Sequence, residues 1–224
     1  MYLSRVNVLA EQPDQLAKIL KADHYELHRL LWRLFPEHKE RDFLFRRDES
    51  KGFPVFYLQS SIKPSPLAGI LAVESKEFNP QLKTGDRLRF TLRANAANKS
   101  KVVEGHKANL AQYARRDVVV HLKKTLLDQG IAQEDLPDQA ELEQQAGETW
   151  LEKKAEKNGF KVISVIADGY QQHHFKKRGI KISTLDFQGV LEVIEPELFI
   201  RDALYKGIGP AKAFGCGLLS LARI

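Results

Sequence analysis

The sequence predicts a mixed α+β protein whose two halves each form a four-stranded antiparallel sheet with two helices. Strand-like and helix-like segments follow one another in the order β-α-β-β-α-β, and this order occurs twice along the chain. The chain has 224 residues, 43% of them hydrophobic, which is enough for one large or two small domains with packed cores. No sequence repeat accompanies the repeated order, so the duplication rests on pattern alone.

The first half contains both strand signals and helix signals. An alternating pattern predicts a strand over residues 1–9, and a long helical pattern runs from Pro13 to about Phe35, where Pro36 ends it. The remaining elements are two strands over 42–47 and 53–59 that form a hairpin, a short helix over 64–73 and an alternating strand over 87–93.

A small, polar and basic segment at residues 95–116 separates this half from the second one. The second half is expected to contain strands at 118–120, 161–167, 180–193 and 218–222, and helices at 141–157 and 196–205. We therefore predict tandem ferredoxin-like domains, a topology that also underlies RRM-type RNA binders. The expected boundaries are an N-terminal domain at 1–94, a connecting segment at 95–116 and a C-terminal domain at 117–224.

Basic charge is gathered in patches. The net charge is +6, but residues 99–124 alone hold seven basic and two acidic side chains. Lys176, Lys177 and Arg178 form a second basic cluster, at the predicted turn between two strands. Such patches are typical of proteins that bind a polyanion, although solvated loops explain the charge equally well.

The cysteine content and the apolar pattern indicate the cellular compartment in which the protein is expected. The single cysteine, Cys216, cannot form an intramolecular disulfide or a thiolate metal cluster, which fits a reducing compartment. No stretch approaches the roughly 20 apolar residues of a membrane span, and the N-terminus lacks the apolar core of a signal peptide. We expect a cytoplasmic protein that does not associate with a membrane.

The first long helix has an unusual polar face. Its leucines and isoleucine fall on one stripe, whereas Tyr25, His28, Arg29 and Trp32 fall on the opposite side, with Arg33 at the flank. Solvated helix faces usually carry Lys, Glu and Gln. We therefore expect this face to be exposed and to form part of a site.

These residue types suit RNA cleavage without a metal, in which the ribose 2′-hydroxyl attacks the adjacent phosphate. Histidine has an unperturbed pKa close to neutral pH, so a residue such as His28 can act as general base or acid, and Tyr25 is its neighbour one turn earlier. Arg29 or Arg33 supplies the fixed positive charge that stabilises the phosphorane.

Two other interpretations of this helix remain open. A lone helical histidine is more often a boundary residue than a catalyst, and Trp32 can simply close the edge of a core. His24 and His28 are also spaced as an i, i+4 metal-binding pair, but an H-E-x-x-H pattern and an evident third ligand are missing. We therefore expect neither a metal nor another cofactor.

Four glycines and a lysine mark the C-terminal segment GIGPAKAFGCGLLS, which spans residues 207–220. Gly207, Gly209, Gly215 and Gly217 would let backbone N–H groups approach a phosphate closely, and Lys212 would add positive charge. A tight turn into the last strand explains the same glycines, and the sequence favours neither interpretation.

Five segments closely resemble one family. They are MYLSRV, YELHRLLWRLF, RDFLFR, LRFTLRANA and GIGPAKAFGCGLLSL, and together they span nearly the whole chain. They resemble the CasE-type CRISPR RNA endoribonuclease of the type I-E Cascade complex. The resemblance implies two ferredoxin-like domains, cleavage of repeat RNA at the 3′ base of its hairpin without a metal, and retention of the product with the other Cascade subunits.

The resemblance also implies roles for individual residues. The family's catalytic histidine and tyrosine match His28 and Tyr25, and Arg33 matches its basic residue five positions after the histidine. The resemblance and the residue types together predict which residues contact the RNA. These residues are Arg29, Lys176, Lys177, Arg178, Gly207, Gly209, Lys212, Gly215 and Gly217. The alternative is a non-catalytic RRM-like RNA-binding subunit, although the RNP1 pattern is missing.

Overall fold

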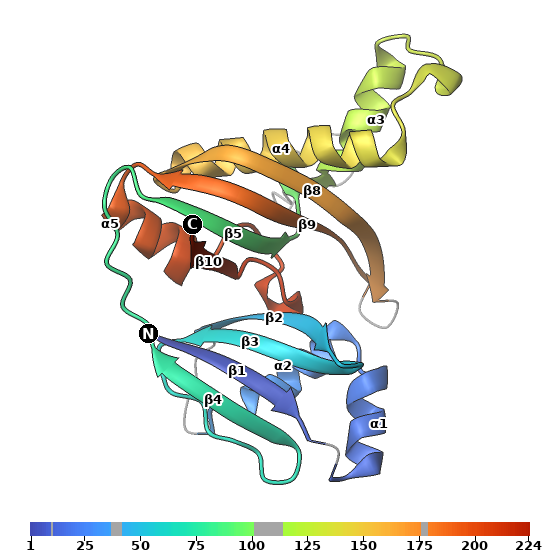
Figure 1. The fold of residues 1–224 in the computed structure, drawn as a ribbon. Coiled ribbons are helices and arrows are strands. Elements are labelled where there is room, and N and C mark those ends of the chain that lie inside the picture. The colour runs from blue at the N-terminus through green and yellow to red at the C-terminus, as the bar shows by residue number, and fades with distance from the viewer. Residues whose placement is uncertain (10, 37–41, 101–113, 176–178) are drawn as a thin grey trace, which may run out of the picture.

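The computed structural model describes residues 1–9, 11–36, 42–100, 114–175 and 179–224 (Figure 1). Within these ranges the strands form two four-stranded sheets and a two-stranded ribbon. The two sheets belong to two α+β units stacked one above the other, which agrees with the predicted tandem ferredoxin-like fold. None of the described helices is long and apolar enough to cross a membrane.

The first sheet has the strand order β2-β3-β1-β4, and all of its neighbours are antiparallel. Its strands are β1 (Tyr2–Val8), β2 (Phe43–Ser50), β3 (Phe53–Ser60) and β4 (Leu71–Glu77). Lys51 and Gly52 join β2 to β3 with φ of 52° and 79°, as the turn of a tight hairpin requires. The helix expected over 64–73 is absent from this unit as described, and β4 begins at Leu71 because that leucine is buried beside β1.

Two helices, rather than one long helix, cover this sheet. They are α1 (Pro13–Lys21) and α2 (His24–Trp32), and Ala22 between them has extended backbone. Asp23 accepts hydrogen bonds from the N–H groups of Tyr25 and Glu26, while the Glu26 carboxylate accepts one from the Asp23 N–H. This reciprocal cap starts a new helix at residue 24, although the apolar stripe continues through it.

The second sheet has the order β10-β5-β9-β8, again antiparallel. Its strands are β5 (Arg87–Ala94), β8 (Phe160–Phe175), β9 (Ile180–Val193) and β10 (Leu219–Arg223). We had expected β5 in the first half of the chain, but it lies between β10 and β9. We therefore propose a domain boundary within residues 78–86 in place of the one expected at residue 94.

Helices cover one face of the second sheet. They are α4 (Gln139–Lys157) and α5 (Pro196–Leu198), which continues into the π-helical turn η3 (Phe199–Tyr205), while α3 (Val118–Asp128) packs mainly against α4 and projects away from the sheet (Figure 1). Residues 118–120, expected as a strand, are the first turn of α3 because Asp117 caps the N–H groups of Val119 and Val120. The ribbon strands β6 (Ala97–Ser100) and β7 (Ala114–Asp117) lie on either side of residues 101–113.

Polar contacts join the two units. The Arg46 guanidinium of β2 donates hydrogen bonds to Thr91 Oγ1 at 2.8 Å and to Ser220 Oγ at 3.0 Å in the second sheet. The Gln59 amide of β3 donates a buried hydrogen bond of 2.6 Å to the Leu204 carbonyl in η3. These contacts hold the second unit against strands β2 and β3 of the first sheet.

Candidate functional site

Helix α2 carries the tyrosine and the histidine on successive turns. The ring centroids of Tyr25 and His28 are 6.3 Å apart, which confirms that the two side chains are neighbours. The Asp23 cap fixes the start of the helix immediately before them. The position of both rings therefore depends on the few residues around this cap.

The structure corrects the expected orientation of His28. Its ring is only 5% exposed and stacks on Phe43 of β2 at 5.3 Å, with the Trp32 ring edge-on at 5.5 Å. Tyr25 and Trp32 are half-buried, and Arg29 and Arg33 are exposed. The prediction of an exposed face is thus wrong for His28, because β2 aromatic rings cover the flank of the helix beside the leucine stripe.

The glycine-rich segment packs against this same helix. Its short turn η4 (Lys212–Phe214) contacts α2 and β2, and Lys212 is half-buried. All four glycines have positive φ, and a Cβ on Gly207 would lie 2.7 Å from both the Gly217 carbonyl oxygen and Leu44 Cδ1. Close packing between the two units therefore requires glycine here.

Several N–H groups of the segment are engaged within the protein. The Ile208 N–H donates to the Gly217 carbonyl at 2.9 Å, and the Gly217 N–H donates to the Arg93 carbonyl at 2.7 Å. The Gly215 N–H donates to the Lys212 carbonyl at 3.3 Å. These bonds favour the tight-turn interpretation for these positions, and phosphate binding by the segment stays a prediction.

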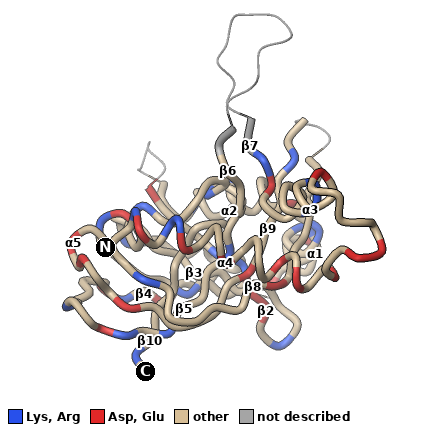
Figure 2. Tube along the Cα trace, turned by 90° about the horizontal axis from the view of Figure 1, so that it is seen from above, with Lys and Arg blue, Asp and Glu red and all other residues tan. Residues whose placement is uncertain are grey.

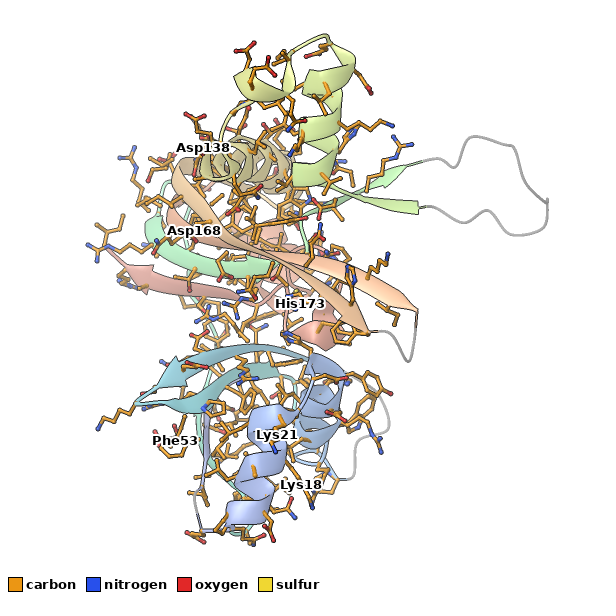
Figure 3. The ribbon with its side chains drawn as sticks, turned by 90° about the vertical axis from the view of Figure 1, so that its right-hand side faces the viewer. Lys18, Lys21, Phe53, Asp138, Asp168 and His173 are labelled. Atoms are coloured by element: carbon orange, nitrogen blue, oxygen red, sulfur yellow. The ribbon has the colours of Figure 1, made fainter. Side chains whose placement is uncertain are left out.

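A second group of rings, which the sequence did not reveal, lies at the start of α2. The His24 and His173 rings are 4.8 Å apart in an edge-to-face arrangement, and the Phe175 and Phe214 rings are 4.9 Å apart. Figure 3 shows His173 on β8 near the level where the two units meet. The sequence indicates His24 only as a candidate metal ligand, because no local pattern relates helix residue 24 to strand residue 173.

The predicted basic tip at Lys176, Lys177 and Arg178 lies outside the described residues, between the ends of β8 and β9. Elsewhere on the chain, Asn98 pairs with Arg116 and Lys99 with Arg115 in the register of the β6–β7 ribbon. Figure 2 shows acidic residues along the loop that follows α3, away from that ribbon.

Neither a metal site nor a reactive thiol is found among the described residues. Among the described residues, no three His, Cys, Asp or Glu side chains are grouped so that they could hold a metal ion. Cys216 is buried, and burial raises the pKa of its thiol to about 12. This thiol is protonated at neutral pH and is not a nucleophile.

The fold and this site define a tandem ferredoxin-like α+β protein with a Tyr/His helix packed beside a glycine-rich turn. Residues 1–223 match the family described as "CRISPR associated protein". The chain belongs to this family of CRISPR-associated proteins.

Two relatives and one solved structure match nearly the whole chain. The chain is 34% identical to the CRISPR system Cascade subunit CasE of Escherichia coli over 99% of both chains. It is 32% identical to the CRISPR-associated endoribonuclease Cse3 of Thermus thermophilus over 90% of both. The structure of Thermus thermophilus Cse3 bound to an RNA representing a pre-cleavage complex superposes with a TM-score of 0.70 at 29% identity, covering 99% of this chain and 98% of that one.

Proposed function

We propose that this protein is an endoribonuclease that processes CRISPR RNA and works with the other subunits of a Cascade complex. Support comes from its similarity, along nearly the whole chain, to a relative named an endoribonuclease and to another named a Cascade subunit. The structure superposed on it holds an RNA in a pre-cleavage complex. The substrate is CRISPR repeat precursor RNA, cut at the 3′ base of its hairpin to give a guide RNA that stays bound.

The proposed reaction needs no metal. The ribose 2′-hydroxyl next to the scissile phosphate attacks phosphorus, and the bond from phosphorus to the 5′-oxygen breaks. His28 and Tyr25 move the protons, while Arg33, with Arg29, stabilises the charge of the phosphorane. The products are a 2′,3′-cyclic phosphate and a 5′-hydroxyl.

The observation that carries this proposal is the pairing of Tyr25 and His28 on a capped helix at the junction of the two units. His28 is nearly buried, so RNA binding must expose an edge of its ring before it can transfer a proton. Catalytic contacts commonly tighten only in the substrate complex, which is consistent with this requirement. Lys176, Lys177, Arg178 and Lys212 are proposed to bind the RNA backbone, and recognition rests mainly on the shape of the A-form stem.

The test is incubation of the purified protein with its repeat transcript in excess EDTA, followed by analysis of the ends produced. We expect cleavage at one position, with a 2′,3′-cyclic phosphate on the upstream fragment. A matched transcript with a 2′-deoxy sugar immediately upstream of the cut should remain intact. Cleavage of that transcript would exclude the 2′-hydroxyl as nucleophile, and loss of cleavage in EDTA would exclude the metal-free reaction.

The second candidate function is a non-catalytic RNA-binding subunit, and the 5% exposure of His28 favours it. Such a subunit would bind the repeat hairpin and leave it uncut at every protein concentration. Binding without cleavage by the wild-type protein would therefore select this alternative.

A further inference from the structure

A row of aromatic rings joins three elements that lie far apart in the sequence. His24 opens α2, and its ring contacts His173 at 4.8 Å and Phe175 at 6.2 Å, both near the end of β8. Phe175 in turn contacts Phe214 of η4 at 4.9 Å. The row therefore connects the helix that carries Tyr25 to the end of the β8–β9 hairpin and to the glycine-rich turn.

The surroundings of this row are positively charged. The positive charges of Arg47 on β2 and Arg93 on β5 act on the His24 ring, and Asp23 acts on it in the opposite sense. Burial, His173 and these two arginines together lower the pKa of His24 to about 4. Burial and Arg93 also lower the pKa of His173. Both imidazoles are therefore uncharged at neutral pH, and they pack edge to face without repulsion.

The β9 strand also contributes to this environment. The His173 Nε2 and the Thr184 Oγ1 share a hydrogen bond of 3.0 Å across the hairpin. Asp186 of β9 holds Arg93 through two hydrogen bonds of 2.7 and 2.6 Å. Asp186 offsets part of the Arg93 charge, but Arg47 and Arg93 still disfavour a proton on the histidine pair.

We propose that His24 and His173 are positioning residues, which as an uncharged pair hold the β8–β9 hairpin against helix α2 in the arrangement that RNA cleavage requires. This inference rests on the proposed function. RNA bound by the C-terminal half then meets Tyr25 and His28 in the correct geometry. A positive charge on either ring separates the pair, so the RNA is still bound but is held out of alignment, which slows cleavage.

The test uses three variants at position 173 or beside it. His173→Lys places a permanent charge in the pair, and His173→Phe keeps an aromatic ring that cannot be protonated. His174→Lys adds the same charge one residue further along β8, on the opposite side of the strand, where the side chain is exposed. It is the matched control for any effect of net charge on RNA binding.

Single-turnover cleavage of the repeat RNA, measured over a range of protein concentrations near neutral pH, separates positioning from binding. For His173→Lys we expect the maximal rate to fall by about 10²-fold, since small misplacements cost about this much, while the half-saturating concentration stays within about threefold. His173→Phe and His174→Lys should keep maximal rates close to that of the wild type.

The same variants are compared by amide hydrogen exchange, which does not depend on cleavage. His173→Lys should increase exchange at the end of β8 and at the start of α2, and His174→Lys should not. If His173→Lys fails to fold, His24→Lys introduces the charge from the helix side and should have the same two effects.

Three outcomes would overturn the inference. The first is that His173→Lys and His24→Lys both keep the wild-type cleavage rate and the wild-type amide exchange. The second is that His173→Phe loses as much of the cleavage rate as His173→Lys does. The third is that His174→Lys loses as much of it. Absence of cleavage by the wild type would instead refute the proposed function. The exchange measurement would then decide by itself whether the pair holds the hairpin.

Discussion

At the scale of single residues, the main finding is that an imidazole expected in solvent lies among aromatic rings. His28 is stacked on Phe43 of β2, with Trp32 at its edge. These surroundings limit the contact of the His28 ring with water and with a bound RNA. A catalytic role for His28 therefore depends on how RNA binding rearranges the rings around it.

The first prediction concerns His28 itself. His28→Ala should lower the single-turnover cleavage rate by about 10²–10⁴-fold, the usual contribution of a general acid or base, and should leave RNA binding largely intact. His121→Ala, which removes an exposed histidine from α3, is the control and should cleave like the wild type. Unchanged cleavage by His28→Ala would remove this residue from the mechanism.

The second prediction concerns the pH dependence of stability that His24 causes. Its pKa is about 4 in the folded protein, below the ordinary value of 6.5. Between these two values the unfolded chain binds more protons than the folded one, so stability is lost as the pH falls through this range. The melting temperature of His24→Gln should therefore fall less than that of the wild type between about pH 7 and pH 5.

An exposed histidine supplies the control for this measurement. His121→Gln should follow the wild-type dependence of melting temperature on pH. Parallel curves for His24→Gln and the wild type would show that His24 does not destabilise the folded protein in acid.

At the scale of elements, a side-chain cap determines where the helix carrying Tyr25 and His28 begins. Asp23 satisfies the first N–H groups of α2, and Glu26 completes the reciprocal bond. A reciprocal cap of Asp138 with Glu141 likewise starts α4, and Asp117 starts α3 by accepting from the N–H groups of Val119 and Val120. In each case a short polar side chain, rather than the apolar pattern, sets the first residue of the helix.

The third prediction tests this cap. Asp23→Ala should lower the free energy of unfolding by about 1 kcal/mol, because two N–H groups at the start of α2 lose their acceptor. The measurement is the midpoint of denaturant unfolding. Asp128→Ala, at the C-terminal end of α3, removes an aspartate that caps no helix start and should change stability much less.

At the scale of the whole molecule, packing between the units depends on glycines in the C-terminal segment. Gly207 lies against Leu44 of the first sheet and against the Gly217 carbonyl of its own segment, with φ of 74°. A side chain at this position would be strained by the positive φ, and its Cβ would collide with Leu44 and with the Gly217 carbonyl oxygen. The two units can therefore approach this closely only if residue 207 has no Cβ.

The fourth prediction separates the two effects. Gly207→Ala should destabilise the protein by about 1–3 kcal/mol more than Gly130→Ala does. Gly130 has φ of 90° but open space around its Cβ position, so it reports the backbone strain alone. An equal loss of unfolding free energy in the two variants would show that the packing around residue 207 accommodates a Cβ.

Local patterns were sufficient for some elements and failed for others. Alternating residues predicted β1 and β5, and two segments rich in Phe, Val and Tyr at 42–47 and 53–59 predicted the β2–β3 hairpin. The long helix was predicted without its break, although the Asp23–Glu26 cap is visible in the sequence, because the apolar stripe runs through it. The strand expected over 118–120 is helical because a cap at Asp117 outweighs the β-propensity of three valines.

By itself, the sequence determined the α+β class, the order of most strands, the Tyr25–His28 pair on one helix and the family of the protein. These follow from residue periodicity, from spacing along a helix and from motifs that span the chain. Only the tertiary structure decided that β5 pairs with β9 and β10, that His28 is covered by β2 and that His24 meets His173. The physical reason is that each of these depends on contacts between residues distant in the sequence, which no local pattern encodes.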